Sequence, residues 1–134
     1  MGNEFTLEIY MPGVPMSDPE QFVQGSAVLH VTDVLATAAY YRDTLGFHWD
    51  FGDEHYAVVW RDNAAVHFTR GSTAPSGVHL FLWVRDVDAY YDEIVQRGVK
   101  AEMEPTTQPY GIREFKIEDV NCVAIVFGQD DELI

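Results

Sequence analysis

The pattern of hydrophobic and polar positions occurs twice along the chain, with a spacing of about 53 residues. Each copy has an alternating segment, a Val-x-Asp-Val sequence, a stretch of helical periodicity and a terminating glycine. Asp33 and Asp86 of the two Val-x-Asp-Val sequences are 53 residues apart, and the glycines Gly46 and Gly98 are 52 apart. Two copies are too few for a solenoid. We therefore expect two pseudo-symmetric halves, with a functional site where they face each other.

The first copy is predicted to be a strand, a helix and three short strands. Asp33 can cap a helix whose apolar residues form one stripe, and Gly46 supplies the left-handed stop. The stripe consists of Val34, Ala38, Tyr41 and Leu45. Alternation and turn residues place the strands at Ser26–Val31, Phe47–Asp50, Tyr56–Arg61 and Ala64–Thr69.

The second copy repeats this order after a linker of turn-forming residues, Gly71–Gly77. Asp86 can cap a helix that Gly98 ends, and the apolar face of this helix carries Val87, Tyr91 and Ile94. Strands are expected at Val78–Val84, Val99–Met103, Arg113–Glu118 and Val123–Phe127. The predicted fold class is therefore α+β, with two tandem βαβββ modules that form curved, mostly antiparallel sheets around a cavity.

The chain is expected to form one structural domain with an extension at each end. Residues 1–25 contain several prolines and are predicted to be an N-terminal arm, with a short strand at Thr6–Tyr10. The first module spans residues 26–70 and the second residues 78–128, joined by the linker at 71–77. Residues 129–134 form an acidic tail.

Composition excludes several classes of protein. The formal net charge of −14 repels phosphate backbones and anionic membrane surfaces, so neither nucleic acid nor a membrane is expected as a partner. No apolar run is long enough to cross a bilayer and the N-terminus lacks a signal-peptide pattern, so a cytoplasmic location is expected. The single cysteine excludes an internal disulfide. The acidic charge either concentrates cationic ligands or serves solubility alone.

Two segments resemble the vicinal oxygen chelate superfamily, which includes glyoxalase I, extradiol dioxygenases, fosfomycin resistance enzymes and bleomycin resistance proteins. Val31–Phe47 is close to the first-helix signature of this family, and Tyr110–Phe115 resembles a segment common in bleomycin-resistance-like members. The resemblance covers residues 26–128 and implies a small-molecule ligand and a homodimer whose clefts close between chains. The usual Asp-Pro-Asp-Gly turn is here Asp119–Cys122, in which only the aspartate is kept. Cys122 is expected to be a small packed thiol rather than a nucleophile.

Metal chemistry in this superfamily uses four positions, which the resemblance places at Ser26, His67, His79 and Val126. A catalytic divalent metal needs at least three protein ligands and an open position, and only the two histidines are good ligands. His30 shares a strand face with Ser26 but lies roughly 13 Å further along, at about 3.3 Å per residue, and is too distant to replace it. We therefore expect no cofactor. A divalent metal on His67 and His79 is the alternative, and no catalytic residue is assigned.

Alternation along the strands favours a ligand cavity. One face of the predicted strands carries Tyr56, Val58 and Trp60, then Ala65, His67 and Thr69, then His79, Phe81 and Trp83. Val78, Leu80, Leu82 and Val84 would pack beneath the helices. Rings supply stacking area and polar groups orient a ligand, whereas burial in the core is the alternative for these aromatics. The predicted ligand-binding residues are His30, Trp60, His67, His79, Phe81, Trp83, Tyr110 and Arg113.

Arg113 has two interpretations, because a charge in an apolar strand is costly unless it is paired. It either anchors a ligand carboxylate or phosphate, or forms a structural ion pair with one of the many acidic residues.

Three functions follow from these residues. The first is a bleomycin-resistance-like protein that sequesters an aromatic or cationic ligand in an aromatic-lined cleft. The second is a metal-dependent glyoxalase I-like lyase or dioxygenase that uses His67 and His79. The third is a metal-free enzyme in which a cavity histidine acts as acid or base. The acidic charge, the aromatic face and the incomplete ligand set favour the first.

Overall fold

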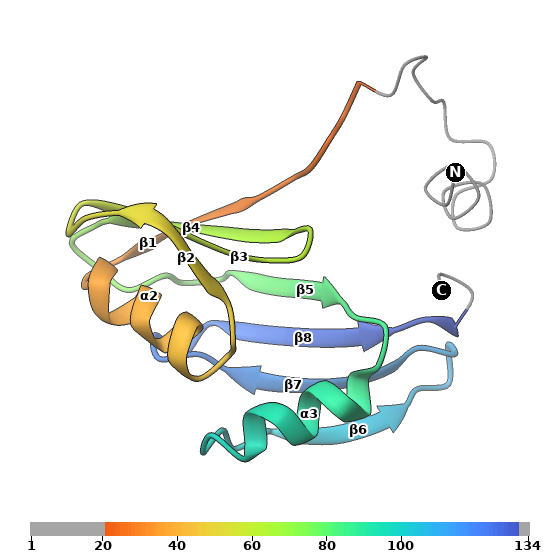
Figure 1. The fold of residues 1–134 in the computed structure, drawn as a ribbon. Coiled ribbons are helices and arrows are strands. Elements are labelled where there is room, and N and C mark those ends of the chain that lie inside the picture. The colour runs from red at the N-terminus through yellow and green to blue at the C-terminus, as the bar shows by residue number, and fades with distance from the viewer. Residues whose placement is uncertain (1–20, 132–134) are drawn as a thin grey trace.

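Each half of the repeat folds into a strand, a helix and three further strands in the computed structural model, which describes residues 21–131 (Figure 1). The first module contains β1 (Ala27–Val31), α2 (Val34–Asp43), β2 (His48–Gly52), β3 (Tyr56–Arg61) and β4 (Ala64–Arg70). The second contains β5 (His79–Trp83), α3 (Val87–Val95), β6 (Met103–Thr107), β7 (Arg113–Glu118) and β8 (Ala124–Gln129). The strand expected at Thr6–Tyr10 lies outside the described residues.

The eight strands form two separate four-stranded sheets, one in each module. The strand order is β1-β4-β3-β2 in the first sheet and β5-β8-β7-β6 in the second. In each sheet the first strand pairs in parallel with the last strand of the module, and the other pairings are antiparallel. The sheets are therefore mixed and do not close into a barrel. The prediction of an α+β fold with two tandem βαβββ modules is confirmed.

The two helices begin at the aspartates that the sequence indicated. The side chains of Asp33 and Asp86 accept hydrogen bonds from backbone N–H groups in the first turns of α2 and α3. The predicted stripe of α2, Val34, Ala38, Tyr41 and Leu45, is buried. In α3 the more deeply buried aromatic is Tyr90 rather than the predicted Tyr91, because Tyr90 contacts the other module. Neither helix of the described residues is long and apolar enough to cross a bilayer.

The first strand after α3 lies further along the chain than the alternation predicts. We expected it at Val99–Met103, whereas β6 runs from Met103 to Thr107. Val99 is instead buried in the core at the end of α3, where its N–H donates to the carbonyl of Ile94 at 3.3 Å. Pro105 lies within β6, and a sheet accepts proline there because β6 is an edge strand.

The turn between β7 and β8 is tight although it lacks the family's glycine. The Cys122 N–H donates to the Asp119 carbonyl at 2.9 Å, and Cys122 takes the left-handed conformation with φ of 63°. The Asp119 carboxylate accepts hydrogen bonds from the backbone N–H groups of Asn121 and Val123. Cys122 is exposed, so the prediction of a packed thiol is wrong. This turn directs the Cys122 side chain outward.

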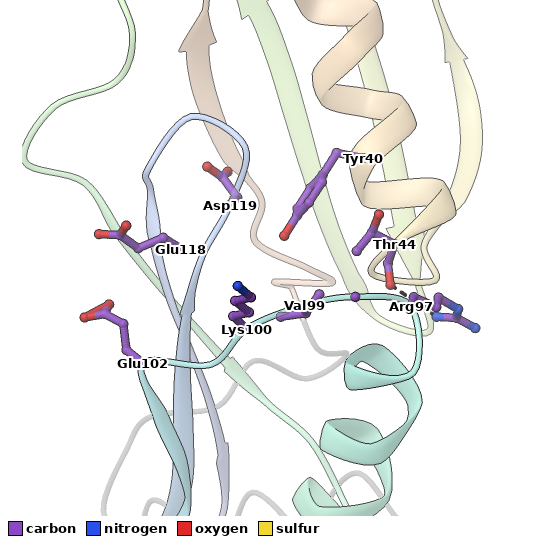
Figure 2. A pocket seen from close by; sticks show the side chains of 9 residues that line it. Tyr40, Thr44, Arg97, Val99, Lys100, Glu102, Glu118 and Asp119 are labelled. Atoms are coloured by element: carbon purple, nitrogen blue, oxygen red, sulfur yellow. Dashed lines mark hydrogen bonds between the residues drawn. The ribbon is translucent and has the colours of Figure 1, made fainter.

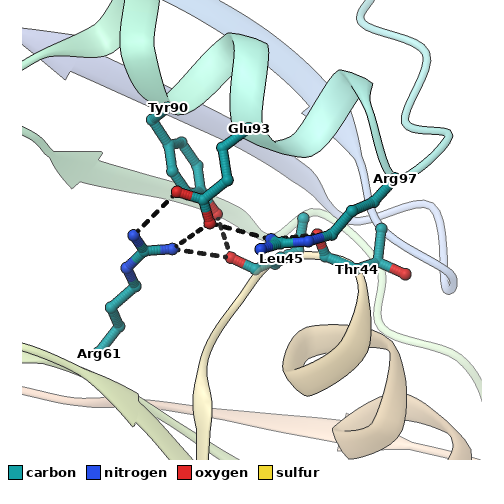
Figure 3. Close-up of polar contacts among 6 residues, drawn as sticks. All are labelled: Thr44, Leu45, Arg61, Tyr90, Glu93 and Arg97. Atoms are coloured by element: carbon teal, nitrogen blue, oxygen red, sulfur yellow. Dashed lines mark hydrogen bonds and ion pairs between the residues drawn. The ribbon is translucent and has the colours of Figure 1, made fainter.

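A polar network joins the two modules beside the shared core (Figure 3). The Glu93 carboxylate on α3 accepts hydrogen bonds from both terminal nitrogens of Arg61 on β3, at 2.7 and 3.0 Å, and from Arg97 at 2.9 Å. The Tyr90 hydroxyl donates to the carbonyl of Leu45 at 2.7 Å, and Arg61 also lies over the Tyr90 ring. Side chains from both modules therefore hold one module against the other.

Candidate ligand-binding site

Each sheet has one face that packs on the core and one that does not, which we call the outer face. In β5, Leu80 is buried and Leu82 packs against the core. Phe81 and Trp83 point to the other side, and they are 46% and 43% exposed. α3 contacts β6, β7 and β8, and the ribbon shows it on one side of the sheet (Figure 1). The predicted alternation of core and exposed positions along β5 is confirmed.

The outer face of the first sheet contains the predicted His67. The strand register places it between Val28 on β1 and Val58 on β3, with Phe51 on β2 beyond Val58. The Tyr56 hydroxyl lies 2.6 Å from Nδ1 of His67, and the two rings meet edge to face. One ring nitrogen of His67 is therefore engaged with Tyr56, which orients the imidazole on this face.

Trp60 and His30 lie on the same outer face, on either side of His67. Trp60 is 39% exposed and its ring lies 4.7 Å from that of His48, centroid to centroid. His30 is exposed on β1 and lies opposite Thr69. The first outer face thus brings together three of the predicted ligand-binding residues, His30, Trp60 and His67.

The four expected metal positions do not assemble a ligand set within one chain. His67 belongs to the first sheet and His79 to the second. Ser26 precedes β1 and Val126 lies on β8. Within residues 21–131, no three His, Cys, Asp or Glu side chains come together as metal ligands. A resident metal with three protein ligands does not fit these donors in a single chain.

The outer face of the second sheet is the more aromatic of the two. The rings of Phe81 and Trp83 lie 4.7 Å apart at an angle of 56°. Gly128 on β8 lies opposite Trp83 in the register, and the Phe81 ring covers it. A Cβ on Gly128 would lie 2.6 Å from Cζ of Phe81. The missing side chain at Gly128 therefore makes room for the Phe81 ring. His79 is exposed on the same face.

Glu114 also lies on this outer face, and it is not among the predicted ligand-binding residues. It lies on β7 directly opposite Gly128, so Gly128 separates it from Trp83. Glu114 is only 8% exposed, and its Oε1 accepts a hydrogen bond of 2.6 Å from the hydroxyl of Tyr110. That bond to Glu114 raises the pKa of the Tyr110 hydroxyl. The signal was present in the alternation, because Phe115 and Ile117 face the core and so direct Glu114 outward.

Arg113 lies on the helix side of the second sheet, next to Glu114 in sequence. Its guanidinium forms two hydrogen bonds of 2.8 Å with the carboxylate of Asp88 on α3. This contact holds the pKa of Asp88 below its usual value. The ion pair is one of the two interpretations that the sequence allows. The role as an anion anchor stays a prediction, and it would require this ion pair to open.

A separate cavity of about 440 Å³ lies at the seam between the modules (Figure 2). It is formed by the end of α2, the segment that follows α3 and the turn between β7 and β8. Its lining residues are Tyr40, Thr44, Arg97, Gly98, Val99, Lys100, Glu102, Glu118 and Asp119. None of the predicted ligand-binding residues lines it, and charges of both signs surround it. The cavity is therefore separate from the aromatic rings of the outer faces.

Comparison with known proteins identifies the family. The model of the Glyoxalase/Bleomycin resistance protein/Dioxygenase superfamily matches residues 23–127. The chain belongs to this superfamily. No curated protein matches the chain in sequence.

Among solved structures, a bleomycin-binding protein from the bleomycin-producing Streptomyces verticillus, solved with copper(II)-bleomycin, is 30% identical. The match has a TM-score of 0.70 and covers 80% of this chain and 95% of that one. A bleomycin resistance determinant encoded on the transposon Tn5 is 20% identical, with a TM-score of 0.72 over 82% of this chain and 99% of that one. A lactoylglutathione lyase from Agrobacterium tumefaciens is 16% identical, with a TM-score of 0.67 over 84% and 96%. The last two show the fold alone.

Proposed function

We propose that this superfamily member sequesters a small-molecule ligand that carries flat aromatic or cationic groups, on its outer faces and without converting it. The observation that carries the proposal is the exposure of large aromatic rings on sheet faces that neither helix of the described residues covers. Phe81 and Trp83 form one such pair, and Trp60 lies on the other sheet. Stacking of a flat ligand on these rings would bury their apolar area and give the exposed rings a stacking partner.

The charge of the chain supports a ligand that is not anionic. The formal net charge is −14, and Glu114 adds a carboxylate among the aromatic side chains of the second outer face. Such a field raises the local concentration of cations and repels anions. The 30% identical bleomycin-binding protein of known structure was solved with copper(II)-bleomycin, which is consistent with this ligand class.

We also propose that the binding cleft is completed by a second copy of the chain. Each outer face is open on one side, and the two histidines expected as ligands, His67 and His79, lie in different sheets. A homodimer that places the first outer face of one copy over the second outer face of the other would enclose both sets of rings. Sedimentation equilibrium tests this. A protein that stays monomeric at concentrations at which it binds the ligand would contradict the shared cleft.

Binding is tested by fluorescence titration, because Trp60 and Trp83 lie on the outer faces. Copper(II)-bleomycin and metal-free bleomycin are the probes, and we expect saturable quenching with both. Trp83→Ala should weaken binding at least tenfold. Trp49→Phe is the matched control, because Trp49 lies opposite the core residue Val59. Unchanged bleomycin recovered after binding supports sequestration.

Thermal unfolding provides the second measurement. A ligand that binds only the folded state raises the Tm, by a free energy of about 2.7 kcal/mol at a concentration of one hundred times its Kd. The absence of both quenching and a Tm shift would overturn the proposal. The same measurement with divalent ions, with and without chelator, tests the metal-dependent lyase or dioxygenase. A metal-dependent shift that His67→Ala abolishes would favour that enzyme instead.

A further inference from the structure

We infer that Glu114 is the anchor for a cationic group on the ligand, and that the second outer face selects protonated amidines, guanidines or amines attached to a flat aromatic system. This inference rests on the proposed binding function and specifies the ligand class of the same site. It starts from the position of Glu114 within β7. The neighbouring Phe115 and Ile117 are fully buried in the core, so the strand directs Glu114 to the outer face.

Glu114 is buried although it lies on the face away from the core. Phe81 covers Gly128 on one side of it, and Cγ2 of Ile112 would lie 3.3 Å from a Cβ on the same glycine. The Tyr110 ring stands at the rim, two-thirds exposed, with its hydroxyl bonded to Oε1. The carboxylate therefore has apolar and aromatic neighbours and one neutral hydrogen-bond donor.

No cation of the described part of the chain neutralises Glu114. Lys116 is the next outward-facing residue on β7, and its ammonium pairs with Glu102 at 3.8 Å. Arg113 is bound to Asp88 on the other side of the sheet. A carboxylate in such surroundings costs free energy unless a positive group compensates it. A ligand cation would supply this charge.

The site also has the geometry for a cation joined to a flat ring system. Trp83 and Glu114 lie on either side of Gly128 in neighbouring strands, which places their backbones roughly 10 Å apart at about 4.8 Å per strand. The Phe81 ring lies over the glycine between them. A ligand stacked on Phe81 and Trp83 would thus present a substituent at one end to Glu114. A positively charged N–H donor on this substituent would form a charge-assisted hydrogen bond with the carboxylate.

Isothermal titration calorimetry with two probes of the same shape tests this inference. The probes are 6-amidino-2-phenylindole, which is cationic, and the neutral 2-phenylindole-6-carboxamide. Wild-type protein should bind the amidine at least tenfold more tightly than the amide. Glu114→Gln should weaken amidine binding at least tenfold and change amide binding less than twofold.

Glu118→Gln is the matched control. Glu118 lies on the same strand and the same face, roughly 13 Å away at about 3.3 Å per residue, and its substitution removes the same charge. If selectivity came only from the overall acidic field, Glu118→Gln and Glu114→Gln would reduce amidine binding equally. We expect Glu118→Gln to leave the amidine preference within twofold of wild type.

Tyr110→Phe separates a ligand contact from a structural role for the Tyr110–Glu114 pair. This variant frees Oε1 of Glu114 and keeps the charge, so the amidine preference should persist. Equal loss of amidine and amide binding in both Tyr110→Phe and Glu114→Gln would overturn the inference, as would no amidine binding by wild type.

If Trp83→Ala abolishes bleomycin binding while Glu114→Gln leaves amidine selectivity unchanged, the inference fails and the proposed function stands. If neither bleomycin nor either indole binds, the proposed function fails as well.

Discussion

The hydroxyl of Tyr41 on α2 donates a 2.7 Å hydrogen bond to Oδ2 of Asp119, in the turn between β7 and β8, 78 residues away in sequence. Both residues are buried. Oδ1 of the same carboxylate accepts the N–H groups of Asn121 and Val123. One carboxylate thus closes the turn of the second module and holds the helix of the first.

Tyr41→Phe should lower the free energy of unfolding by about 2 kcal/mol. The substitution removes a buried hydrogen bond to a charged acceptor and leaves Oδ2 of Asp119 without its donor. Urea denaturation measures the change. Tyr40→Phe is the control, because Tyr40 is half-buried on the same helix and should change stability by less than about 0.5 kcal/mol. Equal effects of the two substitutions would show that the hydrogen bond does not stabilise the fold.

The burial of Tyr41 beside Asp119 predicts lower stability at alkaline pH. Burial, and then the Asp119 charge, raise the pKa of Tyr41 well above its ordinary value of 10.0. Above pH 10 the unfolded chain therefore binds fewer protons at this residue than the folded chain. The stability that the protonated Tyr41 hydroxyl contributes is fully present below pH 10, and it is lost as the pH rises through the folded-state pKa. Urea midpoints between pH 8 and 11 should fall, and the decline should be shallower in Tyr41→Phe.

Glu93→Gln should loosen the contact between the modules. The Glu93 carboxylate accepts bonds from Arg61 and Arg97, and the hydrogen bond from Arg61 is the main reason that its pKa is lowered. We expect a loss of about 1 kcal/mol, because these side chains are about one-third exposed. A lowered folded-state pKa gives stability that is present above about pH 4.5 and is lost as the pH falls through the folded value.

Urea denaturation at pH 7 and at pH 3 separates the parts of this prediction. The difference between wild type and Glu93→Gln should shrink at pH 3. Asp43→Asn is the control, since Asp43 pairs with Arg42 on the exposed surface within one module. If the free energies of unfolding of wild type and Glu93→Gln differ by the same amount at both pH values, the pKa argument is contradicted.

Hydrophobic periodicity predicted most of the fold because burial follows it directly. The caps at Asp33 and Asp86 and the buried stripe of α2 came from local rules. Local rules did not predict the position of β6. Val99 is apolar because it packs in the core at the end of α3, and it does not belong to a strand. Contacts between the modules, such as that of Tyr90 with the Leu45 carbonyl, connect residues far apart in sequence and have no local pattern.

Alternation predicted the exposure of the aromatic rings at the candidate site, but not the buried charge beside them. Phe81, Trp83 and Trp60 are exposed on outer faces as the alternation requires. The alternation places Arg113 and Glu114 on opposite faces of β7, but it does not indicate that the Glu114 carboxylate is buried. Glu114 is buried beside Tyr110, whose hydroxyl bonds to its carboxylate, and opposite Gly128 on another strand, over which the Phe81 ring lies. Such three-dimensional cover is not encoded in a local pattern.

Cys122→Gly should stabilise the protein by about 0.5–1 kcal/mol. Cys122 has φ of 63°, a conformation that costs a side-chain-bearing residue about 1–2 kcal/mol, and the added flexibility of glycine in the unfolded chain offsets part of the gain. Thermal and urea denaturation measure the change. Cys122→Ala keeps the strain and should give no gain. A stabilisation shared by both variants would assign the effect to removal of the thiol.

Gly128→Ala should weaken binding of flat aromatic ligands about tenfold while the protein stays folded. A Cβ at Gly128 would lie 2.6 Å from Cζ and 2.9 Å from Cε1 of Phe81, so the ring must move away from its present position. The ring is nearly half exposed and can turn outward, so the Tm should change by only a few degrees. The effect on affinity follows from the loss of stacking with Trp83 at the present geometry.

Titration of Gly128→Ala with bleomycin, followed by tryptophan fluorescence, measures this effect. Gly25→Ala is the control, because a Cβ at Gly25 meets no atom within 4 Å. The emission of Gly128→Ala without ligand should also differ from wild type, since Trp83 loses its ring neighbour. A changed emission spectrum together with unchanged bleomycin affinity would place the ligand away from Phe81, and would move the binding site to the first outer face around Trp60.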